Sequence, residues 1–146
     1  MLVYTLKNIQ DDVEEFANNH HQVYSYSFGS PKIIGTKSQD YPLIHLSPTT
    51  SKNQGSRMNM GFDIYILDLE KQDYSNLVDI LTETMNIGVD LVSFFQSQND
   101  EYYYLNNDYV TFTPISAFDP VLSGYILSVE FEVDQNNNNC DIPWTN

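Results

Sequence analysis

Residues 58–95 read MNMGFDIYILDLEKQDYSNLVDILTETMNIGVDLVSFF and contain the strand and the helix that decide the fold. From 58 to 66 every second residue is apolar, which is the period of a strand with one buried face. Tyr65 and Leu67 make the opposite face partly apolar, so the strand is expected in the middle of a sheet. From 77 to 95 apolar residues recur every three or four positions, which predicts an amphipathic helix of roughly five turns. This helix is expected to pack on the strand and to bury Ile80, Leu81, Ile87 and Leu91.

The link between this strand and this helix is short and acidic. Asp68, Glu70 and Asp73 are spaced in it somewhat like the ligands of a cation loop, but the glycine and the distal glutamate of an EF-hand are missing. The link is therefore predicted to be solvated, with Ser75 or Asp73 as the residue that caps the helix.

The rest of the chain adds one helix and several strands. Residues 47–56 are polar and contain Pro48 and Gly55, so a loop of ten residues is predicted between two strands. The other predicted elements are a helix at 2–18, strands at 23–28, 43–46 and 121–133, and a hairpin that joins 102–105 to 109–112. They predict an α+β fold, in which a mostly antiparallel sheet packs against an N-terminal helix and one long central helix. A single domain is expected over 1–146, with a C-terminal tail at 135–146.

Composition favours one folded domain with a real core. The chain has 146 residues, of which 41% are hydrophobic and 14% aromatic. Its apolar runs fall short of the roughly 20 residues that span a bilayer, and its first residues lack the features of a signal peptide. We therefore expect a protein that is made in the cytosol and has no membrane partner. The single Cys140 excludes an intramolecular disulfide and a multi-cysteine metal site.

Charge is the most unusual bulk property. Twenty Asp and Glu oppose six Lys and Arg, which gives a formal net charge of −14. All six basic residues lie at or before Lys71, and four of them fall between Lys32 and Arg57. Such a chain is not expected to hold nucleic acid by neutralising phosphates. The acidic surface either keeps the protein soluble, or repels DNA and fits a basic partner.

The sequence contains little that points to catalysis. His20 and His21 are expected at the surface at a helix end, and His45 is expected to be a structural residue within a strand. Cys140 has no basic neighbour in sequence that would activate its thiol. A glycine-rich phosphate loop and a serine nucleophile elbow are also missing. We therefore predict a protein that is not an enzyme and that needs neither a cofactor nor a metal.

Several short segments, in their order along the chain, resemble one known family. They are Phe28-Gly29, residues 41–44 (YPLI), residues 73–76 (DYSN), residues 112–114 (FTP), Phe118-Asp119, Gly124-Tyr125 and residues 139–143 (NCDIP). In this order the chain resembles the neck proteins of tailed phages that infect Bacteroidota, including crAss-like phages. These proteins are similar to tail terminator, or tail completion, proteins. The resemblance implies a small α+β subunit without catalytic residues, assembled into a ring around the DNA channel between portal and tail.

For this chain the resemblance implies a homo-oligomeric ring of six-fold or twelve-fold symmetry in the virion, assembled in the bacterial host cytoplasm. Portal, neck and tail proteins would be its neighbours, and genomic DNA would pass through an acidic lumen without specific binding. The candidate subunit contacts are Lys52 and Arg57, which would face Glu130 and Glu132 of the next copy, and Ile142 and Trp144 in an apolar hook. The hook either binds an adjacent subunit or packs on its own domain.

Two other classes of function fit the same sequence. One is another structural component of the virion, in the tail tube or the baseplate, because such proteins share the α+β plan. The other is a small non-viral binding protein that works as a monomer, which a measurement of mass in solution would separate from a ring.

Overall fold

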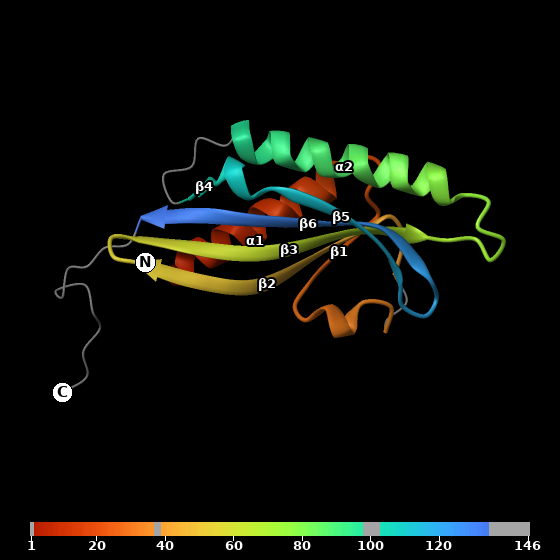
Figure 1. Cartoon of the computed structure of the whole chain (residues 1–146), viewed down its shortest axis with the longest axis horizontal. Coiled ribbons are helices and arrows are strands. Elements are labelled where there is room, and N and C mark those ends of the chain that lie inside the picture. The colour runs from red at the N-terminus through yellow and green to blue at the C-terminus, as the bar shows by residue number, and fades with distance from the viewer. Residues whose placement is uncertain (1, 37–38, 98–102, 135–146) are drawn as a thin grey trace.

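The computed structural model describes residues 2–36, 39–97 and 103–134 and consists of one sheet with two helices (Figure 1). The elements are α1 (Leu2–Asn19), β1 (Ser25–Phe28), the 3₁₀ turn η1 (Pro31–Ile33), β2 (Leu43–Gln54), β3 (Arg57–Leu69), α2 (Leu77–Ser97), β4 (Tyr104–Leu105), the 3₁₀ turn η2 (Asn107–Tyr109), β5 (Thr111–Ala117) and β6 (Leu122–Asp134). The fold is α+β, as predicted. The predicted helices at 2–18 and 77–95 and the predicted strands at 58–66 and 121–133 are confirmed as α1, α2, β3 and β6.

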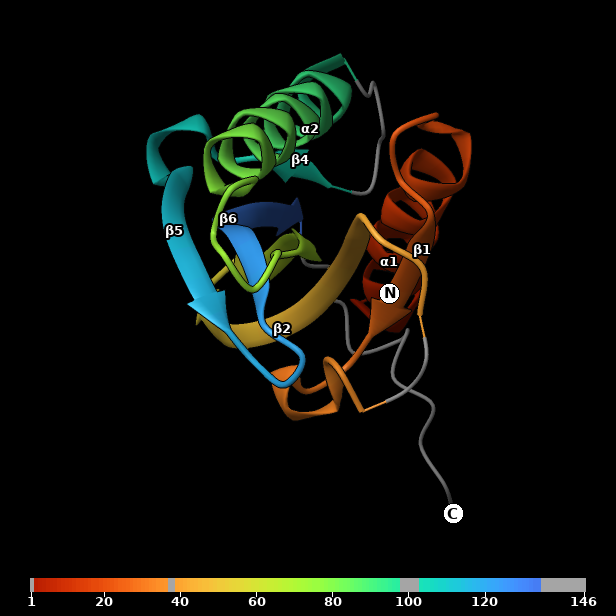
Figure 2. The same cartoon turned by 90° about the vertical axis from the view of Figure 1, so that its right-hand side faces the viewer.

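The sheet has the strand order β1-β2-β3-β6, and β4 and β5 both lie beside β6. β1 pairs with β2 in parallel, and the other strand pairs are antiparallel. β3 is central, as its two partly apolar faces predict, because β2 and β6 pair with it on either side. Both helices cover the same face of the sheet, as Figures 1 and 2 show, and we call the opposite side the outer face.

The main core lies between the two helices and the sheet. Its aromatic centre is Phe131 of β6, whose ring centroid lies 4.8 Å from that of Phe95 in α2 and 5.8 Å from that of Phe62 in β3. The ring of Tyr103 packs edge-on against Phe131 at 5.2 Å. α1 closes the core with its buried apolar stripe, Ile9, Val13, Phe16 and Ala17. The three- and four-residue spacing of this stripe explains why residues with this pattern form a helix here.

Helix α2 buries one apolar stripe against the sheet. Ile80, Ile87 and Leu91 are buried, as predicted. Leu81 is also predicted to be buried, but it is only partly buried. Each residue turns a helix by about 100°. Leu81 therefore lies to one side of the buried stripe, where it lines a groove together with Tyr125.

A second, smaller core lies on one half of the outer face. Ile34, which follows η1, packs there on sheet residues from β2, β3 and β6, and Tyr41 and Phe118 lie at its border. The sheet residues are Leu43, Tyr65, Leu67 and Leu122. Figure 2 shows η1 on the side of the sheet opposite to the helices. Half of the outer face is thus covered by the chain itself.

The predicted ten-residue loop at 47–56 is wrong, because β2 continues to Gln54 and pairs with β3. The turn consists of Gly55 and Ser56 alone, and Gly55 has a φ of +75°. A glycine with positive φ at the first central position is typical of a two-residue type II′ hairpin turn. Residues 48–54 are polar because this part of β2 is exposed, not because it is irregular.

The predicted hairpin between 102–105 and 109–112 is also wrong. β4 and β5 both pair with β6, so they are two parts of one edge strand, interrupted by η2. The side-chain oxygen of Asn106 accepts a hydrogen bond from the Asp108 N–H at 3.2 Å, and the Asn106 N–H still donates to the carbonyl of Glu130 at 2.9 Å. Asn106 therefore starts a local turn that bulges out of the strand without reversing it.

Candidate interaction surfaces

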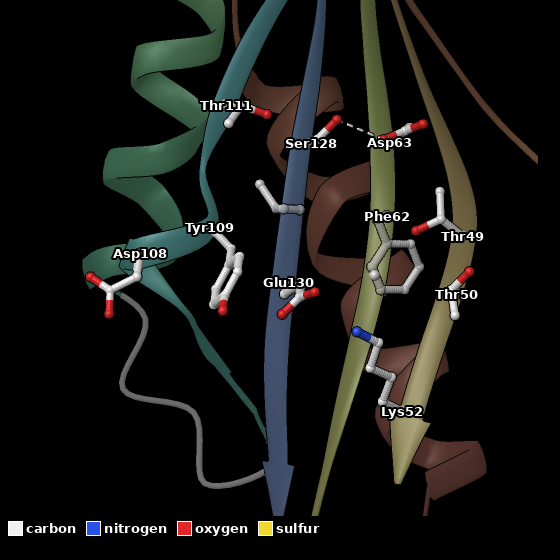
Figure 3. A pocket seen from close by; sticks show the side chains of 12 residues that line it. Thr49, Thr50, Lys52, Phe62, Asp63, Asp108, Tyr109, Thr111, Ser128 and Glu130 are labelled. Atoms are coloured by element: carbon white, nitrogen blue, oxygen red, sulfur yellow. Dashed lines mark hydrogen bonds between the residues drawn. The ribbon is translucent and has the colours of Figure 1, made fainter. Parts of the chain in front are cut away.

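Within the described residues, the half of the outer face near the Gly55–Ser56 turn is uncovered and forms a shallow groove of about 470 Å³ (Figure 3). β3 and β6 supply its floor, β2 one side, and η2 with the start of β5 the other. Among its polar side chains are Thr49, Lys52, Asp63, Tyr109, Ser128 and Glu130. Four strands and a 3₁₀ turn, from distant parts of the sequence, thus build one surface.

The shape of this groove depends on Gly61. A β-bulge shifts the register of β2 between Pro48 and Ser51, so that Thr49 and Thr50 approach the backbone of β3. A Cβ atom on Gly61 would lie 2.5 Å from the Thr49 Oγ1 and 2.7 Å from the Thr50 carbonyl oxygen. Because the second contact is with backbone, residues larger than glycine do not fit without a shift of the strand.

The groove contains charges of both signs, with the negative sign in excess. Asp63, Asp108 and Glu130 supply three carboxylates, and Lys52 supplies one ammonium group (Figure 3). Asp63 accepts a hydrogen bond of 2.8 Å from the Ser128 hydroxyl, which fixes its position on the floor. Such a lining suits a polar or basic protein surface better than an apolar ligand.

The structure brings four of the six predicted contact residues together on the outer face of one chain. Arg57 Nη1 lies 3.6 Å from Glu132 Oε2 within the chain, and Lys52 and Glu130 line the same groove. Both partners of the Arg57–Glu132 pair reach solvent, so its contribution to stability is expected to be at most about 1 kcal/mol. Whether these residues meet a second copy stays a prediction. Ile142 and Trp144 lie outside the described residues.

The helix layer forms a second charged surface, on the other side of the molecule. α1 contributes four carboxylates, namely Asp11, Asp12, Glu14 and Glu15, and α2 contributes three, namely Asp79, Glu83 and Asp90. Lys7 is the one basic residue in the two helices. The outer side carries Lys32, Lys52 and Arg57 beside Asp63, Asp108, Glu130 and Glu132, so the two sides of the sheet differ in their share of basic residues.

Glu70 belongs to the link that is predicted to be solvated, but it is buried, so that prediction is wrong at this position. It is 8% exposed, and its Oε2 accepts hydrogen bonds from the hydroxyls of Ser116, at 2.9 Å, and Ser123. Its N–H donates to the carbonyl of Val121 at 3.1 Å. Glu70 thereby fastens the end of β3 to the β5–β6 hairpin.

The start of α2 also differs from the prediction. The helix begins at Leu77, and the N–H of Ile80 donates to the carbonyl of Asn76, so Asn76 occupies the cap position. Asp73 instead accepts a hydrogen bond of 3.1 Å from the Ser75 N–H in the preceding turn. The side-chain oxygen of Asn76 accepts from the Lys71 N–H at 2.9 Å and so orders the link.

The histidines have structural contacts. His45 is fully buried, where its Nε2 lies 3.0 Å from the Gly29 carbonyl and its Nδ1 lies 2.6 Å from the Ser27 hydroxyl. With Nε2 as the donor, Nδ1 accepts from the serine, and burial lowers the pKa of His45 below 6.5. His20 is less exposed than expected, at 10% of its side chain, and its Nε2 lies 2.9 Å from Oδ2 of Asp90 in α2. His21 is exposed, as predicted.

No protein-family model matches the chain, and no curated protein matches its sequence. The family resemblance consequently depends on the short segments quoted from the sequence. Among the described residues, no group of three or more His, Cys, Asp or Glu is placed to hold a metal ion. In the same part of the chain, neither helix is long and apolar enough to cross a membrane.

Proposed function

We propose that this chain is a structural subunit of a tailed-phage virion, which assembles into a ring in the neck or tail around the DNA channel. Two points support the proposal. Short sequence segments, in their order along the chain, resemble those of phage neck proteins. The α+β fold with two helices on one face of a sheet is the kind of fold that this resemblance implies.

The observation that carries the proposal is the difference in the share of basic residues between the two sides of the sheet. A cyclic ring repeats one heterologous contact, so each subunit needs two different patches that complement each other. The outer face offers Lys52 and Arg57 beside β2 and the carboxylates of Glu130 and Asp108 towards β6 and η2. The helix layer, with seven carboxylates against one lysine, fits a surface that must not hold DNA.

The assembly state of the purified protein tests the proposal. Native mass spectrometry and electron microscopy of the concentrated protein should reveal a closed oligomer of six or twelve copies with a central channel. A gel-shift assay at roughly 150 mM salt should detect no DNA binding, because phosphate-driven binding needs several basic residues together. A protein that stays monomeric at every concentration would overturn the ring and favour the monomeric binding protein.

Charge reversal tests which patches meet in the ring. The pair Lys52→Glu and Arg57→Glu should weaken assembly, and adding Glu130→Lys with Glu132→Lys should restore part of it. If the fourfold variant assembles no better than the twofold one, this pairing between copies is wrong, and the ring rests on other contacts.

A matched control keeps the total charge equal. Lys7→Glu with Lys71→Glu changes the net charge by the same amount at two exposed sites outside the outer-face groove. It should leave assembly intact. Because Arg57 pairs with Glu132 inside the chain, the unfolding midpoint of each variant is measured as well, which separates a weakened contact from a weakened fold.

A further inference from the structure

Helix α2 has a second apolar stripe that the sheet does not bury. Val78, Leu81, Met85 and Val89 follow one another at spacings of three and four, so they share one side of the helix. Val78 is 76% exposed and Val89 is 49% exposed. Together with the half-buried Leu81 and Met85, the two exposed valines form an apolar strip on α2 that is open to solvent.

A shallow groove of about 360 Å³ runs beside this stripe. Val78, Leu81 and Met85 form its helix side, and Tyr125 of β6 forms the other. Tyr125 is held in place by Phe112 of β5, whose ring centroid lies 6.2 Å away in an edge-on arrangement. Thr82 and Asn86 add polar groups at the rim.

We propose that residues 142–144, Ile-Pro-Trp, of a neighbouring copy bind in this groove; this inference rests on the ring assembly proposed above. The segment is the most compact apolar group outside the described residues, and Trp144 is the only tryptophan of the chain. Tryptophan is the residue type most typical of an anchor that fills a pocket at an interface. The rim supplies Asn86 and Thr82, whose oxygens are acceptors for the indole N–H.

The length of the chain favours a neighbouring copy over the same copy. Nine residues separate Tyr125 from Asp134, the last residue of β6, which corresponds to about 30 Å of strand. Ten residues separate Asp134 from Trp144, and they span at most about 33–36 Å when fully extended. In Figure 1 β6 ends at the side of the sheet opposite to the start of α2. A tail that returned to its own groove would have to retrace β6 with almost no slack, whereas a tail that crosses to the next subunit need not.

The emission of Trp144 reports its own burial, because no other tryptophan contributes. Selective tryptophan excitation of the full chain is followed from dilute monomer to concentrated assembly. We expect the emission to shift to shorter wavelength, and quenching by iodide to fall several-fold, at the concentration where the mass increases. Met85→Gln, in the groove, should abolish this shift, while Glu83→Gln, an exposed position of α2 outside the groove, should leave it unchanged.

Each outcome bears on a different part of the inference. A blue-shifted emission that does not depend on concentration would place the segment on its own copy and overturn binding to a neighbour. Assembly with Trp144 still exposed would overturn the groove contact and leave the proposed ring standing. Absence of any assembly would overturn the ring and the contact together.

Cysteine crosslinking assigns the groove directly. In a Cys140→Ser background, one chain carries Thr145→Cys and a second chain carries Asn86→Cys, so that a disulfide between them forms only between copies. We expect a crosslinked dimer after mixing and mild oxidation. The control partner carries Gln72→Cys, which lies in another groove at the start of α2. Crosslinking to position 72 in preference to position 86 would overturn the assignment.

Discussion

Ser123→Ala should destabilise the fold much more than Ser116→Ala, although both hydroxyls donate to the same oxygen of Glu70. Ser123 is fully buried, so water cannot replace its hydroxyl when the side chain is truncated. Ser116 is exposed, and water can take its place beside the carboxylate. The two substitutions remove the same group from the same partner and differ in solvent access.

The magnitude follows from the charge of the acceptor. A hydrogen bond to a charged group contributes about 1.5–3 kcal/mol, and a neutral one about 0.5–1.5 kcal/mol. We expect Ser123→Ala to cost about 2–3 kcal/mol and Ser116→Ala to cost less than about 1 kcal/mol. In a Glu70→Gln background the acceptor is neutral, so Ser123→Ala should cost about 1 kcal/mol less than in the parent.

A double-mutant cycle measures this coupling. Urea unfolding of the parent, Ser123→Ala, Glu70→Gln and the double variant gives the four free energies of unfolding, and their combination isolates the pair. If Ser123→Ala costs the same in both backgrounds, within about 0.5 kcal/mol, the carboxylate does not depend on the buried hydroxyl. Glu70 would then not fasten β3 to the β5–β6 hairpin through this contact.

Three further predictions concern the core, the sheet and the buried histidine. Leu91→Ala should cost about 2–5 kcal/mol in chemical unfolding, since Leu91 is fully buried, whereas Val89→Ala on the exposed stripe should stay within about 0.5 kcal/mol; equal costs would contradict the assigned helix faces. Gly124→Ala should lower the thermal midpoint strongly, by the equivalent of several kcal/mol, because its Cβ would lie 1.9 Å from the carbonyl oxygen of Ile66; an unchanged midpoint would contradict the β3–β6 register. Burial lowers the pKa of His45 in the folded chain, so the unfolded chain takes up a proton first as pH falls through about 6.5. The free energy of unfolding should therefore decrease below that pH in the parent, and decrease less in His45→Gln. Equal pH profiles of the two proteins would contradict the lowered pKa of His45.

Long periodic segments made much of this fold predictable. β3 and α2 each repeat their apolar residues over enough positions that the period fixes both the type of element and its buried face. The same holds for α1 and β6. These four elements surround the main core, so the fold class followed from them without knowledge of the remaining strands.

The errors concern elements whose structure depends on distant partners. Residues 48–54 are polar and read as a loop, but pairing with β3 makes them a strand; Gly55 followed by Ser56 was the local signal for a tight turn. Glu70 is buried by serines 46 and 53 residues further along the chain, which local patterning does not reveal. The positions of β4 and β5 in the sheet are determined by their pairing with β6, a strand that follows them in the sequence.

The register of the strands determines which of the predicted contact residues lie close together within one chain. Asn59 of β3 pairs with Lys52 on one side and with Glu132 on the other, so strand pairing brings positions 80 residues apart within two strands of each other. Arg57 already has Glu132 as a partner in the same chain, whereas Lys52 lies in the open groove. In the proposed ring, reversal of Lys52 alone should therefore act mainly on the contact between copies, and reversal of Arg57 alone should also act on the chain itself. If instead both single reversals change only the unfolding midpoint and neither changes assembly, the outer face is not where the copies meet, and the apolar groove beside α2 remains the candidate contact.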